Sequence, residues 1–439
     1  MSSESVKLGL IGLGTVGSGV VHLLAQNNDT IAHKLGRSLS LVQVASRSIE
    51  TKPRPHLGQA RLSMDPWNVV HDPEVDIVIE LIGGIEPARS LILEAIAQGK
   101  DVITANKALL AQHGAEIFAA AEVRGVSVGF EASVAGGIPI IRTLREGLAG
   151  DRNLALFGIV NGTCNYILTT MAEEEEEFSA VLRRAQEQGL AEADPSFDID
   201  GIDTAHKLTL LAMLAFGVHV PFSSVYVEGI RHISQIDILF AREFGYGIKL
   251  LAIAKEENGA VDVRVHPTMI PRSSMLAGVG GAYNAIFVQG EALGSSLYFG
   301  RGAGSLPTAT AVIADVIEVA RNRGMALGPR VPPVGWPWHE LRTIPIRPIE
   351  ELDSDYYLRF MAVDRPGVLA TIAGVLGEHD ISIASVIQRG RSAGDETVPL
   401  VMRTHNAKER NLKTALQWVD QLPVIQGKSV SIRIEENLG

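Results

Sequence analysis

Apolar residues at the start of the chain change from a strand-like run to a helix-like spacing across one short turn. The run from Lys7 to Ile11 predicts a buried strand. It leads directly into GLGTVG at 12–17, after which apolar residues at 20, 21, 23 and 24 predict a helix. This order is the context in which a GxGxxG sequence binds a dinucleotide, although a tight turn without a ligand uses the same residues.

The three glycines of this turn each have a physical task in such a site. Gly12 permits the tight turn, Gly14 lets the backbone approach a pyrophosphate, and Gly17 allows the helix to pack closely on the strand. The first helical turn supplies free N–H groups and the positive end of the helix dipole. The pattern therefore predicts a dinucleotide site here.

Strands and helices continue to alternate through the first third of the chain. The pattern predicts an α/β fold with a doubly wound, Rossmann-type parallel sheet, in which ligands lie at the carboxyl ends of the strands. Lys107 follows such an end and is a candidate active-site residue, although a solvated lysine is an equally good interpretation. The predicted strands are 39–45, 76–82, 101–104 and 126–130, with helices at 86–98 and 108–124.

The end of the second predicted strand bears on the choice of cofactor. An NAD site usually has an acid here that binds the ribose 2′-hydroxyl, whereas an arginine accommodates the 2′-phosphate of NADP. This sequence has Arg47 at that place and no acid before Glu50. The pattern favours NADP, with NAD as the alternative if Arg47 is only a solvated surface residue.

A dense polar segment, residues 185–207, leads into an apolar stretch that predicts a buried helix. If this helix begins near Gly201, Asp203 and Lys207 lie four residues apart on one face. An aspartate that positions a lysine at the start of an apolar helix suits proton transfer. Two other interpretations stay open: a surface ion pair, and a cation site made by the carboxylates of this segment.

The last part of the chain predicts a small domain of its own. Six of the 20 prolines fall between 329 and 348, which is typical of a stiff connector. Beyond the connector the βαββαβ order predicts a ferredoxin-like sandwich. The expected elements are strand 357–363, helix 366–379, strands 381–388 and 397–403, helix 408–419 and strand 429–434.

Composition narrows the class of protein. The 439 residues carry 39 basic and 50 acidic side chains, a net charge of −11, so nucleic-acid binding is not expected. The single cysteine excludes an intrachain disulfide and a multi-cysteine zinc site. It fits a reducing compartment, and with no secretory signal we expect a cytoplasmic protein. The longest apolar stretch, 208–218, is too short to span a membrane.

Six segments together resemble the homoserine dehydrogenase family. In order and spacing the resemblance spans about residues 5 to 340. The turn Asp364-Arg365-Pro366-Gly367-Val368-Leu369 beyond it resembles the first turn of an ACT domain, a module that binds amino acids. The six segments are GLGTVG at 12–17, TANK at 104–107, EASVAGGIPI at 131–140, GIVNGTCNYIL at 158–168, the polar segment 185–207, and GRGAGSLPTATAV at 300–312.

The family resemblance implies a reversible, NAD(P)-linked oxidation of L-homoserine to L-aspartate 4-semialdehyde, run as a reduction in threonine, methionine and isoleucine biosynthesis. It implies that Lys207 is the proton donor and acceptor. Lys107 is expected to be a second lysine at the reacting centre, with contacts to substrate and cofactor. Glu192 is expected to hold the substrate amino group, and Asp198 and Asp203 to form a polar wall around the reacting hydroxyl.

The same resemblance implies the remaining ligands. Thr15 and Val16 are expected at the cofactor phosphates, and Ala303 and Gly304 on the nicotinamide side. A sodium ion is expected in a structural role near the turn that begins at Glu131. Its ligands would be the backbone oxygens of Glu131, Val134, Gly136 and Ile138.

The resemblance also implies the domain organisation and the assembly. The family dimerises through the sheet of its middle domain, which predicts a homodimer or a homotetramer. The helix at 305–323 is expected to return to the first domain. We expect a nucleotide-binding domain at 1–139 plus 300–328, an α+β catalytic and dimerisation domain at 140–299, a proline-rich linker at 329–354 and an ACT domain at 355–439.

The ACT resemblance implies an amino-acid effector, with L-threonine, the pathway product, as the expected one. The effector residues would be Asp364, Gly367, Val368 and Leu369, because a helix N-terminus beside a glycine accepts a carboxylate. Asp380 stands where many ACT domains have Gly or Asn, which is expected to weaken anion binding. An ACT fold used only for assembly stays open.

Two other functions compete with this one. A hydroxyacid dehydrogenase with an ACT module would need a catalytic histidine with an acidic partner, whereas the cluster here consists of carboxylates and lysines. A non-catalytic amino-acid sensor would have lost Lys207 or the glycine turn, and both are present. The sequence therefore favours the oxidoreductase.

Overall fold

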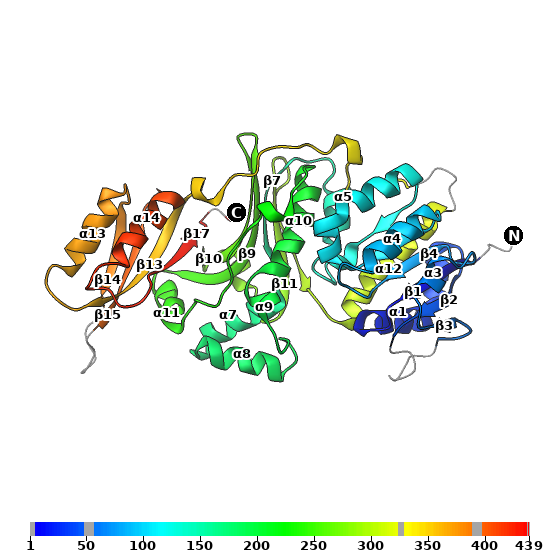
Figure 1. Cartoon of the computed structure of the whole chain (residues 1–439), viewed down its shortest axis with the longest axis horizontal. Coiled ribbons are helices and arrows are strands. Elements are labelled where there is room, and N and C mark those ends of the chain that lie inside the picture. The colour runs from blue at the N-terminus through cyan, green and yellow to red at the C-terminus, as the bar shows by residue number, and fades with distance from the viewer. Residues whose placement is uncertain (1–4, 48–56, 324–328, 389–396, 437, 439) are drawn as a thin grey trace. The chain divides into compact units, whose positions relative to one another are not determined.

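The computed structural model describes residues 5–47, 57–323, 329–388, 397–436 and 438 (Figure 1). By its internal contacts the chain divides into two compact units. Unit 1 contains the predicted nucleotide-binding domain, and unit 2 contains the predicted ACT domain. Unit 1 comprises residues 1–160, 203–225 and 283–344, and unit 2 comprises 161–202, 226–282 and 345–439.

A parallel sheet of six strands forms the centre of the nucleotide-binding part of unit 1. Its strand order is β3-β2-β1-β4-β5-β6, and every pairing is parallel. The order reverses between β1 and β4, which is the place where doubly wound sheets bind their ligands. The Rossmann-type prediction is thus confirmed. The strands are β1 (Val6–Ile11), β2 (Leu39–Ala45), β3 (Arg61–Ser63), β4 (Ile77–Glu80), β5 (Asp101–Thr104) and β6 (Val128–Gly129).

Helices from the start of the chain and from beyond residue 304 pack on this sheet and form one hydrophobic core with it. Leu8 and Leu10 of β1 share one buried cluster with Val20 of α1 and Val312 of α12. The helix after residue 304 therefore returns to the first domain, as predicted, because its apolar stripe completes that core. The helices of this part are α1 (Thr15–Gln26), α2 (Asn28–Leu35), α3 (Trp67–Val70), α4 (Ala88–Ala97), α5 (Lys107–Arg124) and α12 (Ser305–Arg323), and Figure 1 labels all of them except α2.

The rest of unit 1 carries a second group of strands and one long buried helix. Strand β11 (Tyr283–Gly290) pairs antiparallel with β7 (Asn153–Ile159) and β12 (Gly294–Arg301). Helix α10 (Ile202–Phe216) begins where the sequence predicts, and Asn153 Nδ2 donates to the carbonyl of Ala215 near its end. The short elements are η1 (Glu131–Ser133), α6 (Ile140–Arg142), η2 (Thr143–Gly147), η3 (Phe222–Ser224) and η5 (Trp338–Glu340).

Unit 2 combines a long hairpin with several helices. Strands β9 (Tyr246–Glu257) and β10 (Ala260–Pro271) pair along their whole length and turn at Asn258 and Gly259, which have φ of 53° and 74°. The other elements before the linker are α7 (Gly162–Glu174), α8 (Phe178–Glu187), α9 (Ser196–Ile199), β8 (Tyr226–Val227), α11 (Gln235–Glu243) and η4 (Met275–Gly278).

The C-terminal part of unit 2 has the predicted βαββαβ order. Its sheet order β17-β13-β15-β14 is that of a ferredoxin-like fold, and β17 also pairs with β10 through Met269 and Ile434. The ACT sheet thus continues into the β9–β10 hairpin. Its elements are η6 (Ile349–Glu351), β13 (Asp353–Val363), α13 (Val368–Glu378), β14 (Ile383–Gln388), β15 (Thr397–Thr404), β16 (Ala407–Lys408), α14 (Glu409–Val419) and β17 (Val430–Ile434).

Candidate functional site

The glycine turn after β1 has the geometry that a pyrophosphate requires. Gly12 has φ of 103°, and a Cβ on Gly17 would lie 2.0 Å from the carbonyl oxygen of Gly12, so neither position accepts a side chain. A Cβ on Gly14, the residue before α1, would meet nothing within 4 Å. The backbone at Gly14 is therefore open to a ligand, at the N-terminus of a twelve-residue helix.

The segment before α12 lies against this turn. Ser305 Oγ donates a hydrogen bond of 2.7 Å to the carbonyl of Thr15. The neighbouring Gly304 has φ of 120°, which favours glycine. Ala303 and Gly304 are thus held beside the residues predicted to contact the cofactor phosphates, although they are almost 290 positions away in sequence. Gly14, Thr15, Ala303 and Gly304 are brought together, and this arrangement fits a dinucleotide.

Arg47 lies two residues beyond the end of β2 and is exposed. The same strand end meets the glycine turn, because the N–H of Gly12 donates to the carbonyl of Ala45 at 2.8 Å. An arginine here is in the position from which a residue reaches the ribose of a dinucleotide bound to such a turn.

Two lysines meet on one buried carboxylate in unit 1. Lys107 Nζ lies 3.2 Å from Asp203 Oδ1, and Lys207 Nζ lies 2.7 Å from Asp203 Oδ2. The side chain of Asp203 is 6% exposed, that of Lys207 12% and that of Lys107 30%. The predicted pair of Asp203 and Lys207 on one helix face is present, and it lies in a largely buried position, unlike an ordinary surface ion pair.

Helix α5 and the turn before it position Lys107. The lysine is the first residue of the helix, and the N-cap Asn106 donates from Nδ2 to the carbonyl of Gly84 at 2.6 Å. The fully buried Glu80, at the end of β4, accepts a hydrogen bond of 2.6 Å from Thr104 Oγ1. Burial raises the pKa of the Glu80 carboxyl, and its hydrogen bonds oppose that shift.

Glu80 and Asn106 are not among the residues predicted for the site, although the sequence carries a signal for each. Glu80 is an acid that ends an apolar strand directly before two glycines, and Asn106 precedes the expected start of a helix. Both act on the backbone that carries Lys107, so they are positioning residues.

Lys207 is held from a second side by the end of β7. Its Nζ donates to the carbonyl of Val160 at 2.6 Å, which fixes the ammonium between that carbonyl and Asp203. The adjacent His206 is buried and stacks on Phe222, with ring centroids 4.4 Å apart. Burial, with the Lys107 ammonium second, lowers the pKa of His206 to about 4, so this ring is neutral at pH 7.

The other two predicted substrate residues belong to unit 2. Asp198, in α9, accepts hydrogen bonds from Asn161 Nδ2 at 2.8 Å and Thr163 Oγ1 at 3.3 Å, both at the start of α7. Glu192 lies in the loop after α8 and its side chain is exposed. Asp198 is therefore fixed by its neighbours, whereas Glu192 is exposed.

Comparison with known proteins gives family matches to three stretches of the chain. Family models for the homoserine dehydrogenase NAD-binding domain, homoserine dehydrogenase and the ACT domain match residues 12–131, 139–317 and 356–423. A homoserine dehydrogenase of Pseudomonas aeruginosa is 45% identical over 99% of both chains. This chain belongs to the homoserine dehydrogenase family. It is accordingly an oxidoreductase that acts on a CH–OH group with a nicotinamide cofactor.

Solved structures of homoserine dehydrogenases share the fold. That of Thiobacillus denitrificans is 46% identical, covers 99% of both chains and superimposes with a TM-score of 0.93. A hyperthermophilic archaeal homoserine dehydrogenase mutant in complex with NADPH is 25% identical, covers 72% of this chain and 98% of its own, and has a TM-score of 0.62.

The turn expected to hold sodium in this homoserine dehydrogenase is tightly built. The Glu131 carboxylate accepts from the N–H groups of Ile141 and Arg142, both at 2.8 Å, so it caps α6. Asp315 accepts from the Glu131 N–H, and burial, with the Glu131 charge second, raises the pKa of Asp315 to about 7. Gly136 has a left-handed backbone, with φ of 46°, and a Cβ there would lie 2.6 Å from the carbonyl oxygen of Gly302, so this position requires glycine.

The predicted effector residues line a cavity of about 330 Å³ in the ACT domain. Gly367, with φ of 90°, caps α13, and Asp364 Oδ1 accepts a hydrogen bond from Gln388 at 3.3 Å. Asp364, Gly367, Val368 and Leu369 therefore line one cavity, and their role as effector ligands stays a prediction. Asp380 does not line this cavity: it has φ of 60° in the turn after α13, a conformation that explains why Gly and Asn suit that position.

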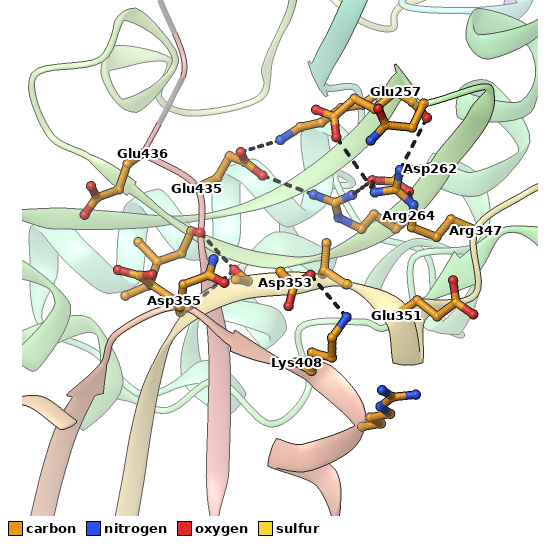
Figure 2. Close-up of a pocket in the computed structure, with 17 residues that line it drawn as sticks. Glu257, Asp262, Arg264, Arg347, Glu351, Asp353, Asp355, Lys408, Glu435 and Glu436 are labelled. Atoms are coloured by element: carbon orange, nitrogen blue, oxygen red, sulfur yellow. Dashed lines mark hydrogen bonds and ion pairs between the residues drawn. The ribbon is translucent and has the colours of Figure 1, made fainter. Parts of the chain in front are cut away.

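A larger cavity, of about 730 Å³, lies elsewhere in unit 2 and contains none of the predicted site residues. Figure 2 shows charged side chains that are paired with one another across it. Arg264 lies 3.0 Å from Asp262 and 3.1 Å from Glu435, and Arg347 lies 3.3 Å from Asp262. Since its central charges neutralise one another, we interpret this network as structural. Its ion pairs connect the β9–β10 hairpin with Arg347 of the linker and with Glu435.

The part of the chain that the structure describes places no three His, Cys, Asp or Glu side chains so that they could hold a metal ion. The carboxylate metal site that the sequence left open at 185–207 therefore has no support. Among the described helices, none combines the length and the apolar character needed to cross a bilayer.

Proposed function

We propose that this homoserine dehydrogenase interconverts L-homoserine and L-aspartate 4-semialdehyde, with reduction as the biosynthetic direction. The observation that carries the proposal is the meeting of Lys107 and Lys207 on the buried carboxylate of Asp203. The nicotinamide cofactor, when bound, would supply the hydride acceptor for the alcohol and the hydride donor for the aldehyde. The side chains of the protein must then move the proton of the reacting hydroxyl and stabilise the negative charge on its oxygen.

Lys207 moves that proton. In the oxidation direction the hydroxyl O–H bond breaks and its proton goes to the Lys207 amine; in reduction the ammonium returns it to the new alkoxide oxygen. Asp203 and the Val160 carbonyl hold Nζ in one place, which keeps the donor directed at a single oxygen. Lys107, which is more exposed, stabilises the negative charge on the same oxygen.

Glu192 and Asp198 stay predictions as substrate ligands. An exposed carboxylate such as Glu192 is available to the α-ammonium of an amino acid, and the hydrogen bonds of Asp198 fix its orientation. The exposure of Glu192 and the fixed geometry of Asp198 support these roles, which otherwise rest on the family resemblance.

The test of the function is a homoserine-dependent assay with the purified full chain. Absorbance of the reduced nicotinamide is followed with NADP and with NAD, and in the reverse direction with L-aspartate 4-semialdehyde. We expect turnover in both directions. A folded sample that binds the nucleotide but consumes none with either substrate would contradict the proposal.

We infer that NADP is preferred and that Arg47 contacts its 2′-phosphate. The position of Arg47 after β2 supports this preference, as does the NADPH complex of the archaeal relative. Replacement of Arg47 by alanine is expected to lower kcat/KM for NADPH at least about tenfold, because a charge-assisted hydrogen bond is lost, and to change that for NADH little.

The control for the cofactor test is Lys34→Ala, which removes another exposed cation of unit 1 at the end of α2. Initial rates are measured with both nucleotides for the three proteins. Equal losses with NADPH and NADH in Arg47→Ala would refute the phosphate contact.

We further propose that L-threonine binds the ACT cavity and inhibits the enzyme. The Asp364 carboxylate would accept from its ammonium, and the N-terminus of α13 would face its carboxylate. The substitution Asp364→Asn is expected to raise the half-inhibitory threonine concentration about tenfold, since the contact to the ammonium loses its charge.

Threonine inhibition curves are measured for the wild type, Asp364→Asn and the control Asp353→Asn, an exposed aspartate at the start of β13, the strand that ends directly before Asp364. Coincident curves for all three proteins would remove Asp364 from the effector site. Threonine that inhibits none of them would leave the ACT domain with the assembly role.

Three further assignments stay predictions. The sodium ion would lie on the backbone oxygens of Glu131, Val134, Gly136 and Ile138, which are ligands of the kind that a hard cation takes. The homodimer or homotetramer is supported by exposed apolar side chains such as Phe299 on β12. The cytoplasmic location rests on the composition.

A further inference from the structure

Unit 2 contains a buried lysine outside the proposed catalytic, nucleotide and effector residues. Lys249, on β9, is 6% exposed. Its Nζ donates to Asn165 Oδ1 at 3.0 Å and to the carbonyl of Val279 at 2.6 Å. An ammonium has three N–H donors, so one remains beyond these two hydrogen bonds. Within the described residues no carboxylate lies close enough to Lys249 to form an ion pair.

This lysine lines a cavity of about 520 Å³, a size typical of small-molecule sites. The cavity is formed by α7, α11, β9 and the loop around η4. Its apolar walls include Leu168, Ile238 and Ile248. The hydroxyl of Thr169, also in the lining, is buried and has no hydrogen-bond partner in the described part of the chain. The cavity thus offers two buried donors surrounded by hydrocarbon.

The charges around the cavity favour an anion. Lys249, Arg242 and Arg272 are its cationic lining residues, and Glu173 is the only acidic one among those described. Both arginines are exposed, and the ion pair of Arg242 with Glu175 is long, at 3.8 Å. The cations exceed the acids by two, in contrast with the paired charges of the larger cavity in Figure 2.

We propose that this cavity binds a small organic carboxylate with a short apolar chain. The carboxylate would accept from the remaining Lys249 N–H and from Thr169 Oγ1, the chain would lie on the apolar walls, and Arg272 would attract the anion at the entrance. The apolar walls favour an organic carboxylate over inorganic phosphate, which has no hydrocarbon to bury. The site goes beyond the proposed function, because none of its described lining residues is assigned to the catalytic, nucleotide or effector site.

The energetics of a buried charge support the same conclusion. An ammonium whose nearest partners are neutral oxygens is costly to bury. Burial lowers the pKa of Lys249 to about 8, with the charge of Glu173 opposing the shift. A bound carboxylate supplies the charge partner that the described residues lack and so offsets the cost of burial.

Calorimetric titration of the full chain with sodium butyrate tests the proposal, with sodium phosphate as a second probe and sodium chloride at equal ionic strength as the blank. We expect saturable butyrate binding that is tighter than phosphate binding. Lys249→Met should weaken it at least about tenfold, and Thr169→Val and Arg272→Gln should each weaken it severalfold.

The matched control is Lys413→Met, which removes a half-exposed lysine of α14 that does not line the cavity. Circular dichroism establishes that each variant is folded. If Lys249→Met does not fold, the exposed Arg272→Gln and the conservative Thr169→Val still decide the matter. The proposal is overturned by absent butyrate binding, by binding of phosphate alone, or by binding that every variant retains unchanged.

Discussion

Replacement of Lys207 by alanine is expected to lower kcat at least about a hundredfold while the nucleotide still binds. The proton of the reacting hydroxyl then has no positioned acceptor, and loss of a general acid or base costs about two to four orders of magnitude. The glycine turn and the 303–304 segment do not contact this side chain in any described interaction, so the dissociation constant for NADPH should stay the same. Steady-state kinetics and fluorescence titration with NADPH give the two quantities.

Two companion variants separate proton transfer from charge alone. Lys207→Arg keeps the positive charge but replaces an amine that titrates by a guanidinium that does not, so it should be nearly as inactive as the alanine variant. Lys107→Ala should lose less activity, because Lys107 is assigned to charge stabilisation. If Lys207→Arg kept most of the activity, Lys207 would only stabilise charge and the proton would have to pass through another group.

The parts of the site that the sequence predicts well are those fixed by local backbone requirements. Gly12 and Gly17 are recognisable because a turn of this kind leaves no room for a Cβ. Asp203 and Lys207 are recognisable because two helical residues four positions apart share a face, and the helix does begin at Ile202. For the same reason β2, β5 and α12 begin and end where the apolar pattern predicts.

Local sequence patterns do not predict contacts between segments that are far apart in the sequence. The meeting of Lys107 with Asp203 joins residues 96 positions apart and depends on the family resemblance, not on spacing. Strands β9 and β10 were not predicted individually, because strands covered on both faces lack the alternation that identifies a half-buried strand. The pairing of β17 with β10 uses a sheet edge, and an edge has no sequence signal of its own.

The continuity of that sheet gives the joint between the hairpin region and the ACT domain a physical basis. Asp237, in α11, is fully buried and accepts hydrogen bonds from Arg359 Nε at 2.6 Å and from the Tyr357 hydroxyl at 3.0 Å. Both donors lie on β13, one of the two inner strands of the ACT sheet. Burial raises the pKa of Tyr357, so the phenol stays neutral and donates. One carboxylate therefore ties the helix to the ACT domain within unit 2.

Loss of the Asp237 charge is expected to destabilise the protein by about 3–5 kcal/mol, because Asp237→Asn leaves the Arg359 guanidinium buried without its counter-charge. Denaturant unfolding followed by circular dichroism measures the loss. Tyr357→Phe, which removes only one hydrogen bond, should cost about 1 kcal/mol.

The double variant Asp237→Asn/Arg359→Met decides whether the charge is the cause. It removes both members of the pair and should recover part of the stability that the single variant loses, since no buried charge is left uncompensated. The contrary result is a double variant whose loss of unfolding free energy equals the sum of the losses of the two single variants. The ion pair would then contribute little, and the packing of β13 against α11 would connect the helix to the ACT domain.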